Sequence, residues 1–239
     1  MKNNLMTSLE FCPILDELYR TGGAVDAAGV RREAEGLSTS NNLAIIRALM
    51  LELKPKRTVE IGLAAGGSAL TFAASHRDLG SSPARQHVAI DPYQRAWHRL
   101  GVTLIERAGL KEFTEIIEEL SCLALPSLMR EGRSFELIYI DGSHAFHEAL
   151  LDFYYARHLL SEGGIVLFDD CTTPDIVKLM RFIRKNIVSF REFDLRPFLP
   201  PERRWRYRIA RTLNKAQCIA FQKVSDPQDD ESWQWKQKQ

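Results

Sequence analysis

The feature that most constrains this chain is a short apolar strand that runs directly into a glycine-rich loop and then into a helix. Residues 58–61 form the predicted strand, Gly62, Gly66 and Gly67 mark the loop, and a helix is predicted from Ser68. Glycines let the backbone pass close to a ligand, and a helix N-terminus offers unpaired N–H groups. Such a unit is typical of a parallel sheet that binds a ligand at the strand end.

Strand and helix patterns continue to alternate along the rest of the chain. Further strands are predicted at 87–90, 113–117, 135–140, 165–168, 190–195 and 217–222. Helices are predicted at 42–53, 97–108 and 145–160, the last stopped by Gly163 and Gly164, and another from Pro174. This alternation indicates a mostly parallel α/β sheet with helices on both faces.

The expected organisation is a single core domain with two appendages. The 239 residues are 45% hydrophobic, which is ordinary for a chain with one core, and no repeat or linker divides the pattern. We expect an N-terminal helical cap segment at 1–40, the core domain at 41–224 and a polar tail at 225–239 that contains Trp233 and Trp235.

Charge and cysteine content argue against several classes of protein. A net charge of +1 gives no overall attraction to nucleic acid or to an acidic membrane. The four cysteines form no CxxC pair, which argues against a zinc knuckle or a disulfide framework and favours a reducing compartment. No secretory signal and no uncharged apolar run of ~20 residues is evident. We expect a cytoplasmic protein without a membrane span or a nucleic-acid partner, and a homo-oligomer is left open.

The residues around the glycine loop distinguish between nucleotide-like ligands. A dinucleotide site needs a middle glycine beside the pyrophosphate, and Ala64 stands at that place. Glu60 would repel phosphates but can accept a hydrogen bond from an ammonium or hydroxyl, and Asp91 at the next strand end can hold both ribose hydroxyls. S-adenosylmethionine carries these groups and no phosphate, so the loop favours it over NAD. The alternative is that both acids are surface residues at strand ends.

Two stretches, 59–69 and 89–92, resemble the first and second motifs of class I methyltransferases, and the similarity runs from about 41 to 223. The resemblance implies a doubly wound, Rossmann-like seven-stranded sheet whose last strand is antiparallel. It implies that Glu60 and the loop residues Gly62, Gly66, Gly67 and Ser68 hold the methionine part of S-adenosylmethionine, and that Asp91 holds the ribose. The stretch 119–121 lies where the family places its adenine contacts, with Ser121 as the contact; Leu120 stands where the family often has an acid.

Two later strands also end in carboxylates. Asp141 follows the strand at 135–140, and Asp169 and Asp170 follow the strand at 165–168, so the three acids converge if these strands are neighbours. Three carboxylates suit a hard, oxygen-seeking ion such as Mg²⁺ or Mn²⁺. His144 would lie at the mouth of the same site and could take a proton as the catalytic base. The alternative is that Asp141 and Asp169 cap helices or bind the amine of the cofactor.

The DxxH pattern followed by a pair of acids resembles metal-dependent O-methyltransferases, especially those acting on sugar or polyketide hydroxyls. The resemblance implies methyl transfer to a hydroxyl of a small molecule, a sugar or natural-product intermediate. Asp141 and His144 would be catalytic, and Asp141, Asp169 and Asp170 would hold the metal. Two alternatives remain open: a metal-dependent, hydroxylase-like oxidoreductase on the same fold, and a non-catalytic cofactor- or RNA-binding module.

One strong basic cluster lies at 202–215. It is compatible with a solvated helix face that keeps Trp205 and Ile209 on the core side, with a lid over an acidic substrate, or with aromatic and arginine stacking on nucleic acid.

Overall fold

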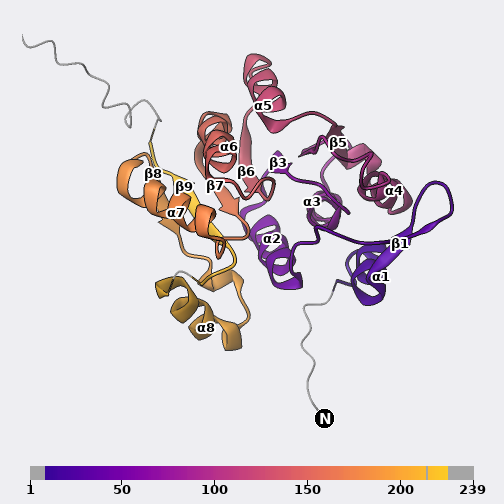
Figure 1. Cartoon of the computed structure of the whole chain (residues 1–239), viewed down its shortest axis with the longest axis horizontal. Helices are drawn as coiled ribbons and strands as arrows, with labels where there is room; N and C mark the ends of the chain where they lie inside the picture. Colours follow the sequence, from indigo (N-terminus) through magenta and orange to yellow (C-terminus); the bar gives the residue numbers. More distant parts are fainter. Residues whose placement is uncertain (1–8, 214, 226–239) are drawn as a thin grey trace, which may run out of the picture.

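The computed structural model describes residues 9–213 and 215–225, and one seven-stranded sheet forms its centre (Figure 1). The strand order is β5-β4-β3-β6-β7-β9-β8, and every neighbouring pair is parallel except the two pairs that include β9. This confirms the predicted doubly wound, mostly parallel sheet with an antiparallel last strand. The bounds are β3 (Thr58–Ile61), β4 (His87–Ile90), β5 (Thr114–Ile117), β6 (Phe135–Ile140), β7 (Leu160–Phe168), β8 (Phe190–Phe193) and β9 (Ile219–Lys223).

Helices cover both faces of this sheet, as the alternation of elements predicted. One face packs against α1 (Pro13–Thr21), α2 (Ser40–Leu53), α3 (Gly67–Asp78) and α4 (Leu100–Arg107). The other face packs against α5 (Ser121–Arg130), α6 (Phe146–Leu159) and α7 (Pro174–Asn186). Strand β6 shows why its sequence is mostly apolar: Leu137 and Tyr139 face the first layer, and Ile138 and Ile140 face the second.

The direction of the strand order reverses between β3 and β6. From β3 the chain winds outward through β4 to β5, and it then returns to place β6 on the other side of β3. In sheets of this kind ligands bind outside the carboxyl ends of the strands at such a reversal. The ends of β3, β4 and β6 are therefore the expected position of a site.

The structure differs from the sequence-based prediction at several elements. Helix α6 ends at Leu159, and the predicted stop at Gly163 and Gly164 is wrong because both glycines lie inside β7. Gly163 has φ 75° in a stretch where the register between β6 and β7 shifts, which explains a glycine there. The sequence reading also missed α5, the short helices η1 (Lys111–Phe113) and η2 (Arg196–Phe198), and the hairpin of β1 (Gly23–Val25) and β2 (Arg31–Glu33).

The basic cluster forms α8 (Pro201–Thr212), between β8 and β9. The alternative in which Trp205 and Ile209 lie on the core side is wrong, because these residues are 55% and 48% exposed. The body-facing side of α8 carries Tyr207, whose hydroxyl donates to the carbonyl of Cys218, and Arg211, whose Nε lies 2.6 Å from Glu192 Oε1.

The remaining expectations concern the N-terminal segment, the tail, membrane spans and the cysteines. The described portion of the predicted cap at 1–40 contains α1 and the β1–β2 hairpin. Trp233 and Trp235 of the predicted polar tail lie outside the described residues. Within the described ranges, no helix has the length and apolar character needed to cross a membrane, and all four cysteines are free thiols.

Candidate functional site

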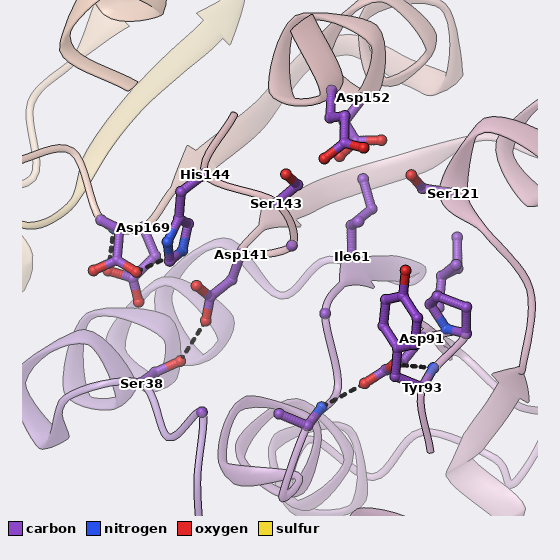
Figure 2. Close-up of a pocket in the computed structure, with 18 of the residues that line it drawn as sticks. Ser38, Ile61, Asp91, Tyr93, Ser121, Asp141, Ser143, His144, Asp152 and Asp169 are labelled. Carbon is purple, nitrogen blue, oxygen red and sulfur yellow. Dashed lines mark hydrogen bonds and ion pairs between the residues drawn. The ribbon is translucent and has the colours of Figure 1, made fainter. Parts of the chain in front are cut away.

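A cavity of about 560 Å³ opens at the carboxyl ends of β3, β4, β6 and β7 (Figure 2). Segment 36–39, just before α2, lines it opposite residues of α6. Asp91, Asp141, Asp152, Asp169 and Asp170 line it, whereas the described lining residues include no lysine or arginine. The size suits a single small ligand, and the charge suits ligands that carry positive charge or hydrogen-bond donors.

Asp91 follows β4 and anchors the glycine loop. Its Oδ2 accepts hydrogen bonds from the backbone N–H groups of Leu63 and Ala64 at 3.2 and 2.7 Å, and from Gln94 Nε2 at 2.9 Å. Its Oδ1 accepts from the Tyr93 N–H at 2.7 Å. Oδ1 accepts this single hydrogen bond among the described residues, so it has capacity left for a ligand hydroxyl.

The predicted glycines have different places in this site. Gly62 lines the cavity with φ 100°, and a Cβ there would overlap the backbone carbonyl of Asp141. Gly66 lets the loop approach Gly101 of α4, and Gly67 lies against Tyr19. Gly66, Gly67 and Ser68 are not among the residues that line the cavity. The two glycines instead allow the loop to pack closely against the neighbouring elements.

Glu60 does not reach the cavity, which differs from the position expected at a strand end. Side chains alternate along a strand, so Ile61 faces the cavity and Glu60 points into the layer beneath α3. There its Oε1 lies 3.3 Å from His87 Nε2, and the side chain is fully buried. Burial raises the pKa of Glu60 to about 8, the Ser68 hydroxyl opposes that rise, and the charge of Asp91 adds to it.

The opposite end of the cavity gathers the predicted acids and histidine. Because β6 and β7 are neighbouring parallel strands, Asp141 and Asp170 lie at the same edge. One ligand atom from each of Asp141, His144 and Asp170 falls within 4.8 Å of the others, and His144 Nε2 is 2.8 Å from Asp170 Oδ2. Burial, and next the charge of Asp169, raise the pKa of Asp141 well above its usual range.

The Asp169 carboxylate is hydrogen-bonded to other residues of the protein. Its carboxylate accepts hydrogen bonds from Asn42 Nδ2 at 2.5 Å and from the hydroxyl of Tyr139, and its Oδ1 also accepts from the Asp170 N–H at 2.7 Å. The sequence placed Asp141, Asp169 and Asp170 together as ligands. The structure brings His144 into that group, with Asp169 beside it as a hydrogen-bonded support.

Several residues of the site were missed in the sequence. Ser38 Oγ donates to Asp141 Oδ2 at 2.9 Å, and Gln217 contacts the Asp170 carboxylate. Neither has a local pattern that would reveal it, because both come from segments distant in sequence. Tyr139 and Asp152 did carry a signal: each is a polar residue on an otherwise apolar buried face, of β6 and α6 respectively.

Comparison with known proteins agrees with this geometry. A family model described as a methyltransferase domain matches residues 59–171. A caffeoyl-CoA O-methyltransferase of Stellaria longipes is 29% identical over 133 residues, covering 53% of this chain and 50% of that protein. O-methyltransferase hkm8 of Aspergillus hancockii is 27% identical over 129 residues, covering 54% and 48%. The chain thus spans about half the length of the curated relatives it matches.

Solved structures share the fold over more of the chain. An O-methyltransferase from Bacillus cereus, in complex with SAH, has a TM-score of 0.63 at 17% identity and covers 89% of this chain and 90% of its own. O-methyltransferase TomG from Streptomyces achromogenes, in complex with SAM, has a TM-score of 0.62 at 15% identity, with coverage of 93% and 92%. The segment 59–171 is thus similar to a methyltransferase domain, and the solved O-methyltransferases share the fold of the chain, in agreement with the prediction from the glycine loop and Asp91.

Proposed function

We propose that this chain is an S-adenosylmethionine-dependent O-methyltransferase that methylates a hydroxyl of a small molecule, a sugar or natural-product intermediate. One observation carries the proposal: a single cavity joins Asp91, which can hold a ribose, to the cluster of Asp141, His144 and Asp170, which can activate a hydroxyl. The matched relatives named as O-methyltransferases support the class of acceptor atom.

The residues present fit S-adenosylmethionine. Asp91 Oδ1 has an acceptor position for a ribose hydroxyl, and Gly62 leaves the backbone open beside it. Asp141 offers a carboxylate for the ammonium or for the metal. The cofactor supplies a methyl group on a sulfonium, and the surplus of carboxylates favours a cationic ligand by electrostatic attraction.

The donor set at the other end fits a divalent ion. Two carboxylates and an imidazole in reach of one another suit Mg²⁺ or Mn²⁺, and no cationic side chain lines the cavity within the described residues. A bound ion would lower the pKa of a substrate hydroxyl. Asp170 holds His144 in place by hydrogen bonding and so prepares it to accept the proton.

Calorimetry with S-adenosylmethionine, S-adenosylhomocysteine and NAD tests the cofactor assignment. We expect binding of the first two and none of NAD, and Asp91→Ala should weaken binding at least about tenfold through the lost ribose contact and loosened loop. Arg95→Ala, on an exposed residue outside the cavity lining, is the matched control. Binding to neither adenosyl ligand would overturn the proposal.

Titration of chelator-treated protein with Mn²⁺ tests the metal and separates two roles of His144. If His144 is a ligand, His144→Ala weakens Mn²⁺ binding as much as Asp170→Asn does. If His144 is the base and Asp169 completes the metal set, Mn²⁺ affinity falls in Asp169→Asn and is retained in His144→Ala. Methyl transfer at the wild-type rate in excess chelator would remove the metal from the proposal.

The oxidoreductase alternative receives no support from the site. Iron sites of that type usually combine two histidines with one carboxylate, and the metal-ligand cluster among the described residues contains one histidine. The comparisons likewise return methyltransferases. The basic helix α8 contributes no residue to the cavity lining, so a lid over an acidic substrate stays an untested prediction.

A further inference from the structure

Asp152 is a buried carboxylate in the cavity wall that no step above uses. It belongs to α6, its side chain is only 2% exposed, and Figure 2 shows it on the α6 side of the cavity, toward Ser121. Its polar neighbours are the Ser121 hydroxyl and the Glu148 carboxylate, and neither neutralises its charge. Burial raises the pKa of Asp152 to about 6, so at neutral pH a charged acceptor faces the cavity.

The floor beside Asp152 is kept free of side chains. A Cβ on Gly142 would lie 2.9 Å from Ile61 Cγ2 and 3.8 Å from Asp152 Oδ2. Glycine at this position therefore leaves an open surface between Ile61 and the carboxylate. Ile61, Ile90 and Leu120 border the same cavity and offer apolar contact to a flat ring.

The order of the strands places the part of the cavity around Asp152 and Ser121 next to Asp91. Asp91 follows β4, and Ser121 follows β5, the edge strand next to it. A base attached to a ribose held at Asp91 can extend toward Ser121 and α6, away from the metal-ligand cluster beyond β6. Leu120 is 47% exposed and has no acceptor group, so Asp152 supplies the carboxylate at this corner.

We propose that Asp152, supported by Ser121, recognises the exocyclic amino group of adenine in the adenosyl ligand. The inference rests on the proposed function, because it presupposes that an adenosyl ligand occupies the cavity. An ionised carboxylate only accepts hydrogen bonds, and the adenine amino group donates them. A buried charge without a cation is costly, and a donor from the ligand offsets that cost.

A ligand lacking the amino group gives the sharpest test. Calorimetry at pH 8 compares S-adenosylhomocysteine with its 6-deamino analogue, in which purine replaces adenine. The wild-type protein should bind the analogue about tenfold to a hundredfold more weakly, because the carboxylate loses a charge-assisted hydrogen bond. The preference should shrink in Asp152→Asn, which keeps a neutral acceptor, and vanish in Asp152→Leu, which has none.

Matched controls separate this inference from the proposed function. Glu131→Gln removes an exposed acid at the end of α5, outside the cavity lining, and should keep the full preference. Thermal unfolding confirms that each variant is folded, and the comparison of ligands on the wild-type protein needs no variant at all. Equal binding of both ligands by the wild-type protein, or an undiminished preference in folded Asp152→Leu, would overturn the inference alone. Binding of neither ligand would overturn the proposed function with it.

Discussion

His144 Nε2 lies 2.8 Å from Asp170 Oδ2, although the two residues follow different strands of the sheet. The pair exists because β6 and β7 are adjacent and parallel, which brings their carboxyl ends together. The carboxylate restricts the imidazole to one orientation, and the imidazole faces the same cavity as Asp141. The proposed proton transfer and the proposed metal binding thus involve the same group of residues, and the first two predictions separate the two roles.

The first prediction concerns His144 as the base. His144→Ala should lower kcat by about 10²–10⁴, the range typical of a lost general base, while the affinity for S-adenosylhomocysteine stays unchanged. His147→Ala is the matched control, because His147 is exposed and does not line the cavity. Steady-state kinetics on an accepted substrate, with calorimetry beside it, makes the measurement. A His144→Ala enzyme with wild-type kcat at every pH would refute the assignment.

The second prediction contrasts the two adjacent acids. Asp169→Asn should lower the free energy of unfolding by about 1–3 kcal/mol, because the buried donors of Asn42 and Tyr139 share this carboxylate. Asp170→Asn should leave stability nearly unchanged, since the side chain is 31% exposed, but should weaken Mn²⁺ binding. Denaturant unfolding without metal measures the first effect. Equal stability losses in both variants would contradict the distinction.

The third prediction follows from the raised pKa of Glu60. Its pKa is about 8 in the folded protein against an ordinary 4.5, so within this window the folded state holds a proton that the unfolded state has released. Stability should therefore fall as pH rises, by up to about 1.4 kcal/mol per pH unit. Glu60→Gln should remove this pH dependence of the free energy of unfolding. The difference between the wild-type and variant curves then gives the contribution of Glu60.

The best interval for this measurement is pH 6.5 to 8. Burial lowers the pKa of His76 and of His87 to about 3. Below pH 6.5 both side chains are therefore uncharged in the folded protein but charged in the unfolded chain. Their contribution makes stability rise with pH and opposes that of Glu60. Parallel wild-type and Glu60→Gln stability curves above pH 6.5 would show that Glu60 is ionised in the folded state.

The fourth prediction concerns Gly62. Gly62→Ala should lower the free energy of unfolding by about 2–5 kcal/mol, because the backbone at φ 100° disfavours a Cβ and that Cβ would overlap the Asp141 carbonyl. Gly80→Ala is the control: φ is 70°, but no atom lies within 4 Å of the added Cβ, so the loss should be about 1–2 kcal/mol. Chemical denaturation measures both. If both variants lost the same free energy of unfolding, the contact between the added Cβ and the Asp141 carbonyl would not contribute to the effect at Gly62.

Local sequence patterns were sufficient for the fold class and for the ends of the strands that form the site. The apolar run of β6 and the glycine loop after β3 required a buried parallel sheet, and acids directly after strands had to lie at one edge. Asp91, Asp141, Asp169 and Asp170 all line the cavity for this reason. The resemblance to class I methyltransferases added the antiparallel last strand.

Tertiary packing decided which of these acids faces a ligand. Glu60 and Asp91 both follow the strand pattern, yet one is sealed beneath α3 with His87 and the other lines the cavity, because side-chain alternation and loop geometry set their directions. Asp169 accepts hydrogen bonds from Asn42 and Tyr139, while Ser38 and Asp152 entered the site from other segments. Periodicity within a segment determines which residues are buried, but contacts between segments determine what a buried polar group binds.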